Sequence, residues 1–253
     1  MKKSYLLLFL IPFSGKLFSQ EVYELHLTSD FRFTNNQNYS YARLLKQYNG
    51  LWAFTDYDRK NNNKVQTGFF TDSSLAYQTG HNKFYDNNKL VYEGNFENGL
   101  RTGWWYFYDK HGSLSDSLYY SVPATKTITT PPAKDFLAEH EKKDTSALVK
   151  NVEIEAEYPG GTKNWTKYLT KTLNYPDLVL KVSPPGQFRS VIQFVVCTDG
   201  SVCNVSCINS THPLLDLEAV KAIRKGANWV PAEQNGRKVK AYRIQPIIFG
   251  IEN

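Results

Sequence analysis

The sequence contains little cysteine. Its 253 residues include only Cys197, Cys203 and Cys207, which all lie in one short stretch. Small secreted domains that depend on disulfides carry many more cysteines, so we expect no framework of disulfide bridges. The chain is 41% hydrophobic and 21% charged, which is enough to form a core and excludes collagen, coiled coil and wholesale disorder.

Sequence motifs for catalysis and metal binding are also absent. The five histidines show no H-E-x-x-H spacing, and neither G-x-S-x-G nor G-x-x-x-x-G-K occurs. Cys203 and Cys207 lie four residues apart on an expected strand, about 13 Å between Cα atoms, which is too far for a shared zinc ion with His212 or for a disulfide. We therefore expect no enzyme, no catalytic or metal-ligating residues and no cofactor.

The charge of the chain does not indicate nucleic-acid binding. The formal net charge is +6, but Lys2, Lys3 and Lys16 belong to a segment that we expect to be removed, which leaves +3. The aromatic residues are unevenly distributed, with 23 of 37 in residues 21–120. This division predicts two different kinds of structure.

The N-terminus has the layout of a secretory signal peptide. Lys2 and Lys3 precede the apolar run Tyr5–Phe13, and the small residues Ser14, Gly15 and Ser19 follow. The apolar run is about half of the 20 residues that a membrane-spanning helix needs. We expect residues 1–20 to be a signal peptide and the protein to lie in the periplasm or cell envelope, and it is membrane-bound only if this segment is not cleaved.

The aromatic half contains repeats. Thr79-Gly80 and Phe84-Tyr85-Asp86 recur 23 residues later as Thr102-Gly103 and Phe107-Tyr108-Asp109, and Val65, Gly68 and Phe70 recur 26 residues later as Val91, Gly94 and Phe96. Aromatic residues that alternate along short segments favour antiparallel strands, and Asn98-Gly99 is the strongest hairpin turn in the chain. The alternation places every second aromatic residue in a shared core, although an exposed aromatic platform for a sugar or peptide is an alternative.

The repeat unit resembles a known family of repeats. The spacing Glu-Gly-x-Phe-x-x-Gly-x-x-x-Gly-x-Trp from Glu93 to Trp105 is similar to the MORN-like repeats of bacterial exported proteins. Two copies cover about residues 64–120, and residues 21–63 fit loosely. We expect residues 21–120 to form an all-β antiparallel region of hairpins that share one aromatic core.

A linker and a second domain follow. Residues 121–150 begin with the Pro- and Thr-rich stretch Val122–Pro132 and continue with mixed charges and one expected helix near 136–143.

In residues 151–253, apolar spacing predicts a helix from Thr162, capped by its hydroxyl, to about Asn174, and another from Pro213 to Ala227. A hairpin with a two-residue turn at Asp199-Gly200 would pair Val196 with Cys203 and place Cys197 on the opposite face, and a final strand runs from about Lys238 to Phe249. Pro246 lacks an amide donor, so this last strand lies at a sheet edge or carries a bulge.

The ordered motifs of this domain resemble the TonB C-terminal domain family, in its Bacteroidetes-type form. They are Tyr175-Pro176, Gly186, Asp199-Gly200-x-Val202, Leu215-Asp216-x-x-Ala219, Trp229-x-Pro231, Asn235-Gly236 and Pro246-x-x-Phe249, preceded by Glu157-Tyr-Pro-Gly-Gly161. With the helix, strand, strand, helix, strand order, the resemblance implies an α+β domain with a three-stranded antiparallel sheet and two helices.

The resemblance also implies a function. In that family the last strand captures an extended peptide of an outer-membrane transporter by β-strand addition. The corresponding partner-binding residues in this sequence are Lys238, Val239, Lys240, Ala241, Tyr242, Arg243 and Ile244. Basic residues of this strand could steer an acidic partner, or could guard the edge against aggregation.

Two alternatives remain. An energy transducer or a regulator of outer-membrane transport requires the N-terminal segment to stay as an anchor, and the short Pro-rich stretch, with a reach of roughly 34 Å, argues against force transmission. A structural role would make peptidoglycan or a neighbouring envelope protein the ligand. A binding protein that takes an extended peptide from an outer-membrane transporter or another envelope protein is the favoured interpretation.

Overall fold

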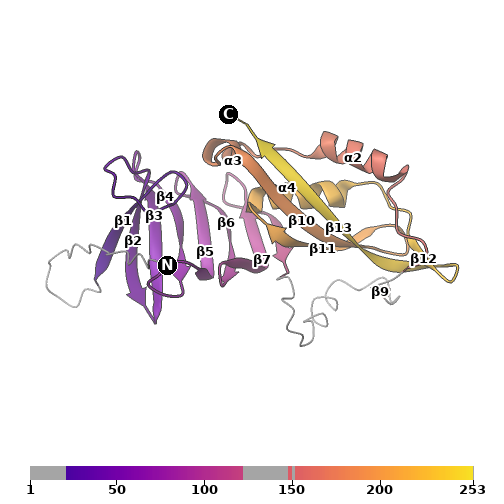
Figure 1. Ribbon diagram of the computed structural model, residues 1–253, viewed down its shortest axis with the longest axis horizontal. Helices are drawn as coiled ribbons and strands as arrows, with labels where there is room; N and C mark the ends of the chain where they lie inside the picture. The colour runs from indigo at the N-terminus through magenta and orange to yellow at the C-terminus, as the bar shows by residue number, and fades with distance from the viewer. Residues whose placement is uncertain (1–20, 122–147, 150–151, 253) are drawn as a thin grey trace, which may run out of the picture. The chain divides into compact units, whose positions relative to one another are not determined.

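The computed structural model describes residues 21–121, 148–149 and 152–252 (Figure 1). The chain divides into two compact units, Met1–Asp116 and Ser117–Asn253, and the division falls inside a strand. The expected signal peptide, almost all of the linker and the helix expected near 136–143 lie outside the described residues. We describe each unit by itself.

The N-terminal unit is a sheet of antiparallel hairpins in which each strand pairs with the next along the chain. Its strands are β1 (Val22–Leu27), β2 (Tyr41–Tyr48), β3 (Leu51–Asp58), β4 (Lys64–Phe70), β5 (Gln78–Asp86), β6 (Lys89–Glu97), β7 (Leu100–Tyr108) and the first residues of β8 (Leu114–Tyr120). The expected turn at Asn98-Gly99 is confirmed, because both residues have positive φ, as a type I′ turn requires. The all-β prediction for this part of the chain is therefore correct.

The sequence repeat has a structural counterpart in the glycines of β4 and β6. A Cβ atom on Gly94 would lie 2.3 Å from a ring atom of Trp105, and one on Gly68 would lie 1.8 Å from Oδ1 of Asn82. Asn82 and Trp105 are separated by the same 23 residues as the repeat. In each copy, a side chain of the later strand therefore lies over a glycine of the earlier strand, and only glycine leaves room for it.

The aromatic core alternates as expected. Trp105 and Phe107 are almost completely buried, whereas Tyr106 between them is 39% exposed. Phe84 stacks on Tyr92 with ring centroids 4.6 Å apart, and Tyr92 also contacts Phe107. β5, β6 and β7 thus share one aromatic core, which no single hairpin could form alone, whereas Leu45, Phe54 and Phe70 of β2–β4 form a cluster of their own.

The C-terminal unit combines a sheet with helices. Its elements after the end of β8 are β9 (Leu148–Val149), α2 (Gly161–Thr172), α3 (Asp177–Val182), β10 (Gly186–Val196), β11 (Val202–Ser210), α4 (Pro213–Lys225), β12 (Ala232–Gln234) and β13 (Arg237–Ile251). Ile192, Phe194 and Val196 alternate along β10 and are fully buried on one face of the sheet. Against this face pack Trp229, which contacts Phe194, and α4, whose Leu215 and Ile223 have no exposed surface.

The expected three-stranded sheet with two helices is too small. β10 lies between β11 and β13, but β12 and β9 also pair with β13, and the end of β8 pairs with β11 in parallel. The described residues also contain a third helix, α3, between α2 and β10. The additional pairings are two or three residues long, so no hydrophobic alternation could reveal them in the sequence.

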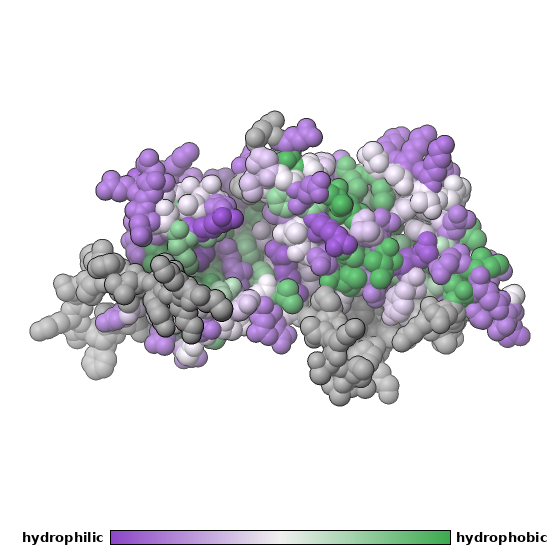
Figure 2. All heavy atoms as spheres, viewed as in Figure 1, coloured by the Kyte–Doolittle hydropathy of each residue, from purple (hydrophilic) through white to green (hydrophobic). Residues whose placement is uncertain are grey.

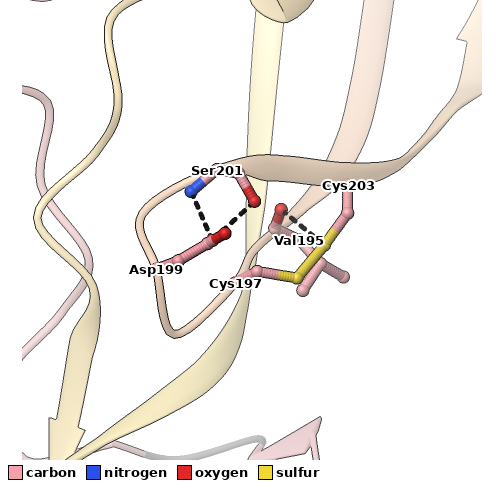
Figure 3. The surroundings of a disulfide bond; sticks show 5 residues. All are labelled: Val195, Cys197, Asp199, Ser201 and Cys203. Atoms are coloured by element: carbon pink, nitrogen blue, oxygen red, sulfur yellow. Dashed lines mark hydrogen bonds between the residues drawn. A yellow bond between two sulfur atoms is a disulfide. The ribbon is translucent and has the colours of Figure 1, made fainter. Parts of the chain in front are cut away.

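The turn between β10 and β11 differs from the prediction (Figure 3). Cys197 pairs with Ser201 and Val195 with Cys203, so the loop has three residues, with Gly200 at φ 84° in the left-handed region. Ser201 donates from its backbone and hydroxyl to the carboxylate of Asp199 at 2.9 and 2.6 Å.

The longer loop shifts the register by one residue at this end of the hairpin. The two cysteines therefore share a face, and Cys197 and Cys203 form a disulfide with Cα atoms 6.6 Å apart. The expectation that Cys197 faces the other side is wrong because a register shift of one residue reverses the faces, and this single bridge was not predicted. Cys207 is buried and forms no disulfide in the described residues, and it pairs with Ile192 as predicted.

The helix termini also differ from the sequence prediction. Gly160 is the N-cap of α2, and Thr162 lies inside the helix without capping it. His212, which sequence inspection considered only as a metal ligand, is the N-cap of α4 and accepts a hydrogen bond from the backbone N–H of Leu214. Its role in this structure is to satisfy an unpaired amide at the helix start.

Candidate functional site

The C-terminal sheet has one long open edge. On the β11 side of the sheet, the end of β8 pairs with β11 through Tyr119 and Tyr120 and covers part of the edge. On the other side of the sheet, β10 pairs with β13 from Ala241 to Ile251, and no described strand pairs with the opposite edge of β13 from Tyr242 onward. Pro246 lies in this open segment, as its missing amide predicts. Unpaired N–H and C=O groups along this edge can pair with an added strand.

The structure divides the predicted partner-binding residues into two groups. Lys238 and Val239 pair with β12, and Lys240 and Ala241 pair with β9, so their edge is already occupied. Tyr242, Arg243 and Ile244 lie at the beginning of the open edge. The available segment therefore begins later in the strand than the sequence suggested and continues to Ile251.

A groove lies between α2 and the open edge. It has a volume of about 510 Å³ and is lined by Gln245–Phe249 of β13 and by residues of α2 and the segment after it. Trp165, Leu169 and Tyr175 contribute large apolar surfaces, and Trp165 donates from Nε1 to Oε1 of Gln245 at 2.7 Å. This hydrogen bond joins the helix to the open strand and forms one end of the groove.

The exposed wall of the groove consists of threonines. Thr162, Thr166 and Thr170 are one helical turn apart on α2 and line the groove. The hydroxyls of Thr166 and Thr170 donate to the carbonyl oxygens four residues earlier, both at 3.0 Å. Because the protons of these two hydroxyls are already bonded to the helix backbone, Thr166 and Thr170 keep only acceptor capacity toward the groove, which suits segments with mainly apolar side chains.

The opposite face of β13 is also apolar and exposed. Tyr242, Ile244 and Ile248 are 40, 58 and 61% exposed and alternate with buried Ile247 and Phe249. Figure 2 shows hydrophobic side chains gathered over the part of the C-terminal unit where β13 crosses this face. A strand added to β13 would thus find apolar surface on both of its faces.

The charged side chains of β13 are used within the domain. Lys240 is only 6% exposed, and Arg243 forms an ion pair with Glu155 at 3.0 Å. Arg237 and Lys238 are exposed beside the Asn235-Gly236 turn, whose two residues have positive φ. Any electrostatic steering of an acidic partner would therefore come from this end of the strand, away from the groove.

Tyr175, Pro246 and Phe249 are the family-motif residues that line the groove, and the other motif residues lie at turns and at the ends of elements. Tyr175 lines the groove and packs edge-on against Phe249, with ring centroids 5.5 Å apart, and Pro176 is the N-cap of α3. Gly186 begins β10, and Pro231 lies between Trp229 and β12. The turn at Asp199-Gly200 packs on the backbone of Trp229, where a Cβ on Gly200 would lie 2.2 Å from the carbonyl oxygen.

Sequence reasoning did not identify the α2 side of the site. Trp165 and Leu169 were assigned only to the helix's apolar face, and Thr166 and Gln245 were not singled out. The repeated threonines at four-residue spacing were the available signal, but only the packing of α2 beside β13 turns this stripe into a wall.

Comparison with known families supports the C-terminal assignment. Residues 173–251 match the model of the family described as Gram-negative bacterial TonB protein C-terminal. The match begins at the end of α2, runs through β13 and does not extend into the N-terminal unit. None of the curated proteins compared matches the chain. In the described residues, no helix is long and apolar enough to cross a membrane, and no group of three or more His, Cys, Asp or Glu could hold a metal ion. The chain thus carries a TonB-like C-terminal segment of the kind found in cell-envelope proteins.

Proposed function

We propose that this protein is an exported binding protein of the cell envelope that captures an extended peptide of an outer-membrane or other envelope partner. The peptide adds as a strand to the open edge of β13 between Tyr242 and Ile251. The observation that carries this proposal is the combination of an unpaired edge with an adjoining apolar groove, because strand addition needs both backbone partners and pockets for alternate side chains.

The groove gives the proposal its side-chain specificity. Every second side chain of an added strand points to the face that carries α2. These side chains would enter the groove between Thr166 and Ile247, where Leu169 and Tyr175 offer apolar contacts. The intervening side chains would lie beside Ile244 and Ile248 on the opposite face. We therefore expect a partner segment of about six residues that is apolar on both faces at its centre.

The disulfide supports export. Cys197 and Cys203 are bonded, and such bridges persist in oxidising compartments such as the periplasm and are rare in the cytosol. The expected signal peptide points to the same compartment. Capture of a peptide at β13 does not require a membrane anchor that transmits energy.

A photo-crosslinking experiment tests the site. A photoreactive amino acid placed at Thr166 or at Ile248 in the full chain is expected to crosslink to one envelope protein in cells, through a short segment identified by mass spectrometry. The same group at Lys167, which is exposed on α2 but does not line the groove, is the control. Crosslinks that appear equally from Lys167, or only from outside the C-terminal unit, would exclude strand addition at β13.

A blocking substitution tests the groove directly. Thr166→Trp fills the groove from an exposed position, so the domain should fold while binding of the crosslinked segment, made as a peptide, weakens about tenfold or more. Lys167→Trp adds the same side chain away from the groove and should leave the affinity unchanged. Equal affinity of both variants would show that the peptide does not enter the groove.

A further inference from the structure

The N-terminal unit contains a cavity that the proposed peptide capture does not use. Its volume is about 300 Å³. Arg43 of β2 and Gln66 and Phe70 of β4 line it, and the loop residues Phe31, Phe33 and Leu75 complete its walls. These residues come from strands and loops of one unit, so the cavity is complete within it.

A buried amide lies at this cavity without a partner. Gln66 is only 7% exposed, and its Nε2 has no hydrogen-bond partner among the described residues. A buried donor left without an acceptor costs about 1–3 kcal/mol, so most buried polar groups in proteins are paired. Nε2 has almost no accessible surface, so a ligand that offers an acceptor in the cavity would satisfy this amide after the side chain of Gln66 turns toward it.

The neighbouring arginine is buried but electrically balanced. Arg43 donates from Nε and Nη2 to the two carboxylate oxygens of Asp56 at 2.7 and 2.8 Å, and both residues are at least 95% buried. Its Nη1 makes no hydrogen bond within the described part of the chain. Because the carboxylate of Asp56 already balances the guanidinium, the pair has no net charge that would attract a second anion, and a neutral acceptor can accept a hydrogen bond from Nη1.

Aromatic rings stand exposed at the mouth of the cavity. Phe31 and Phe33 are 37 and 44% exposed, although large apolar side chains are usually buried. Phe31 stacks on Tyr41 with ring centroids 4.3 Å apart and has a φ of 60°, which is rare for a bulky residue. The exposed rings offer flat apolar surface to a ligand ring.

We propose that this cavity binds a neutral N-acetylated hexosamine, with its acetamido carbonyl accepting from Gln66 or Arg43 and its ring packed against Phe33. The carbonyl supplies a neutral acceptor, and the ring and methyl group supply apolar surface. An extended peptide suits the cavity less well, because β4 is paired with β3 and β5 on both sides and offers no open edge.

Titration of the full chain with N,N′-diacetylchitobiose, followed by NMR and calorimetry, tests the proposal. We expect saturable binding with shifts confined to the cavity residues, and weaker binding of cellobiose, which lacks the acetamido groups. Phe33→Ala and Gln66→Leu should each weaken binding about tenfold. Gln66→Leu should not lower the melting temperature, since it removes an unpaired amide and keeps a similar volume. Tyr106→Ala, which truncates an exposed aromatic residue that does not line the cavity, should leave binding unchanged.

Pull-down on purified cell wall separates a polymeric source of the sugar from a free one. Retention that diacetylchitobiose competes away identifies a glycan polymer, and sugar binding without retention identifies a small saccharide. The proposal is overturned if no saturable binding occurs, if Phe33→Ala and Gln66→Leu both bind as tightly as the unaltered chain, or if only peptides shift the cavity residues. The peptide experiments at β13 are independent of each of these results.

Discussion

The two units bury a carboxylate in different ways. In the N-terminal unit, Asp56 has no exposed surface and is paired with the guanidinium of Arg43, which also lies over the rings of Phe54 and Phe70. In the C-terminal unit, Asp216 is equally buried and accepts hydrogen bonds from hydroxyl groups. The donors are Tyr120 at 2.8 Å, Ser190 at 2.5 Å and Ser210.

The difference follows from what covers each sheet. All regular elements of residues 21–116 are strands, so long side chains such as Arg43 and Trp105 must form much of the core on the sheet's own face. In the C-terminal unit α4 covers the sheet, and Asp216 lies in its first turn, where the helix dipole favours a negative charge. Hydroxyl groups of Tyr120, Ser190 and Ser210 donate to this carboxylate there.

The largest expected effect comes from breaking the ion pair. Asp56→Asn leaves the guanidinium of Arg43 buried without its counter-charge, so the N-terminal unit should lose about 3–5 kcal/mol in its free energy of unfolding. Asp216→Asn keeps acceptor capacity for hydroxyls that can rotate, and should cost the C-terminal unit about 1–2 kcal/mol. Urea unfolding combined with hydrogen exchange resolved by unit measures both. Equal costs would show that the two carboxylates are not held differently.

A second effect tests the dependence of the N-terminal core on glycine. Gly94→Ala places a methyl group 2.3 Å from the ring of fully buried Trp105, so we expect a loss of about 3 kcal/mol in the free energy of unfolding. Gly250→Ala in β13 is the matched control, because nothing lies within 4 Å of its Cβ position, and it should change stability by less than about 0.5 kcal/mol. Thermal unfolding distinguishes the two variants.

Removal of the disulfide should affect only the C-terminal unit. Because Cys197 and Cys203 are six residues apart, the small closed loop predicts a loss of about 2 kcal/mol in Cys203→Ser. Alkylation of the unfolded, unreduced protein from the envelope fraction should modify one thiol, that of Cys207, and reduction should expose all three. Three reactive thiols without reductant would contradict the disulfide.

The smallest effect concerns acid stability of the N-terminal unit. Burial acts to raise the pKa of Glu93, but hydrogen bonds from Tyr108 and His81 outweigh it, and the pKa lies below its usual value of 4.5. A lowered pKa means that the ionised group stabilises the fold above about pH 4.5, and that this contribution is lost as the pH falls through the folded-state pKa. Stability measured from pH 7 to pH 3 should decline less in Glu93→Gln, by under about 1 kcal/mol, whereas exposed Glu97→Gln should follow the unaltered protein.

Sequence reasoning predicted the local structure best where one residue type permits one conformation. Asn98-Gly99 forms the expected turn with positive φ at both residues, and the alternation around Trp105 correctly separated buried from exposed rings. It failed at Asp199-Gly200, because the same residues are compatible with a two-residue and with a three-residue hairpin loop. That difference of one residue decided whether Cys197 and Cys203 could meet.

The candidate site shows the same limit. The sequence pointed to the last strand as the binding edge, but it placed the site at residues 238–244, whereas β12 and β9 already cover the strand through Ala241. These short pairings depend on residues distant in the chain. Two further features have no local signature in the sequence. The threonines around Thr166 look like those of any exposed helix face, and Gln66 looks like any polar residue of a strand.

The sequence by itself determined the two kinds of structure, the glycines of the repeat and the family-like order of motifs in the C-terminal unit. These features depend on periodicity and local conformational preference, which the residue order fixes directly. Only the tertiary structure decided which edge of β13 is open, which helix borders it and which buried polar groups find partners. Those properties arise from contacts between segments far apart in the chain, where a shift of one residue in a loop changes which side chains meet.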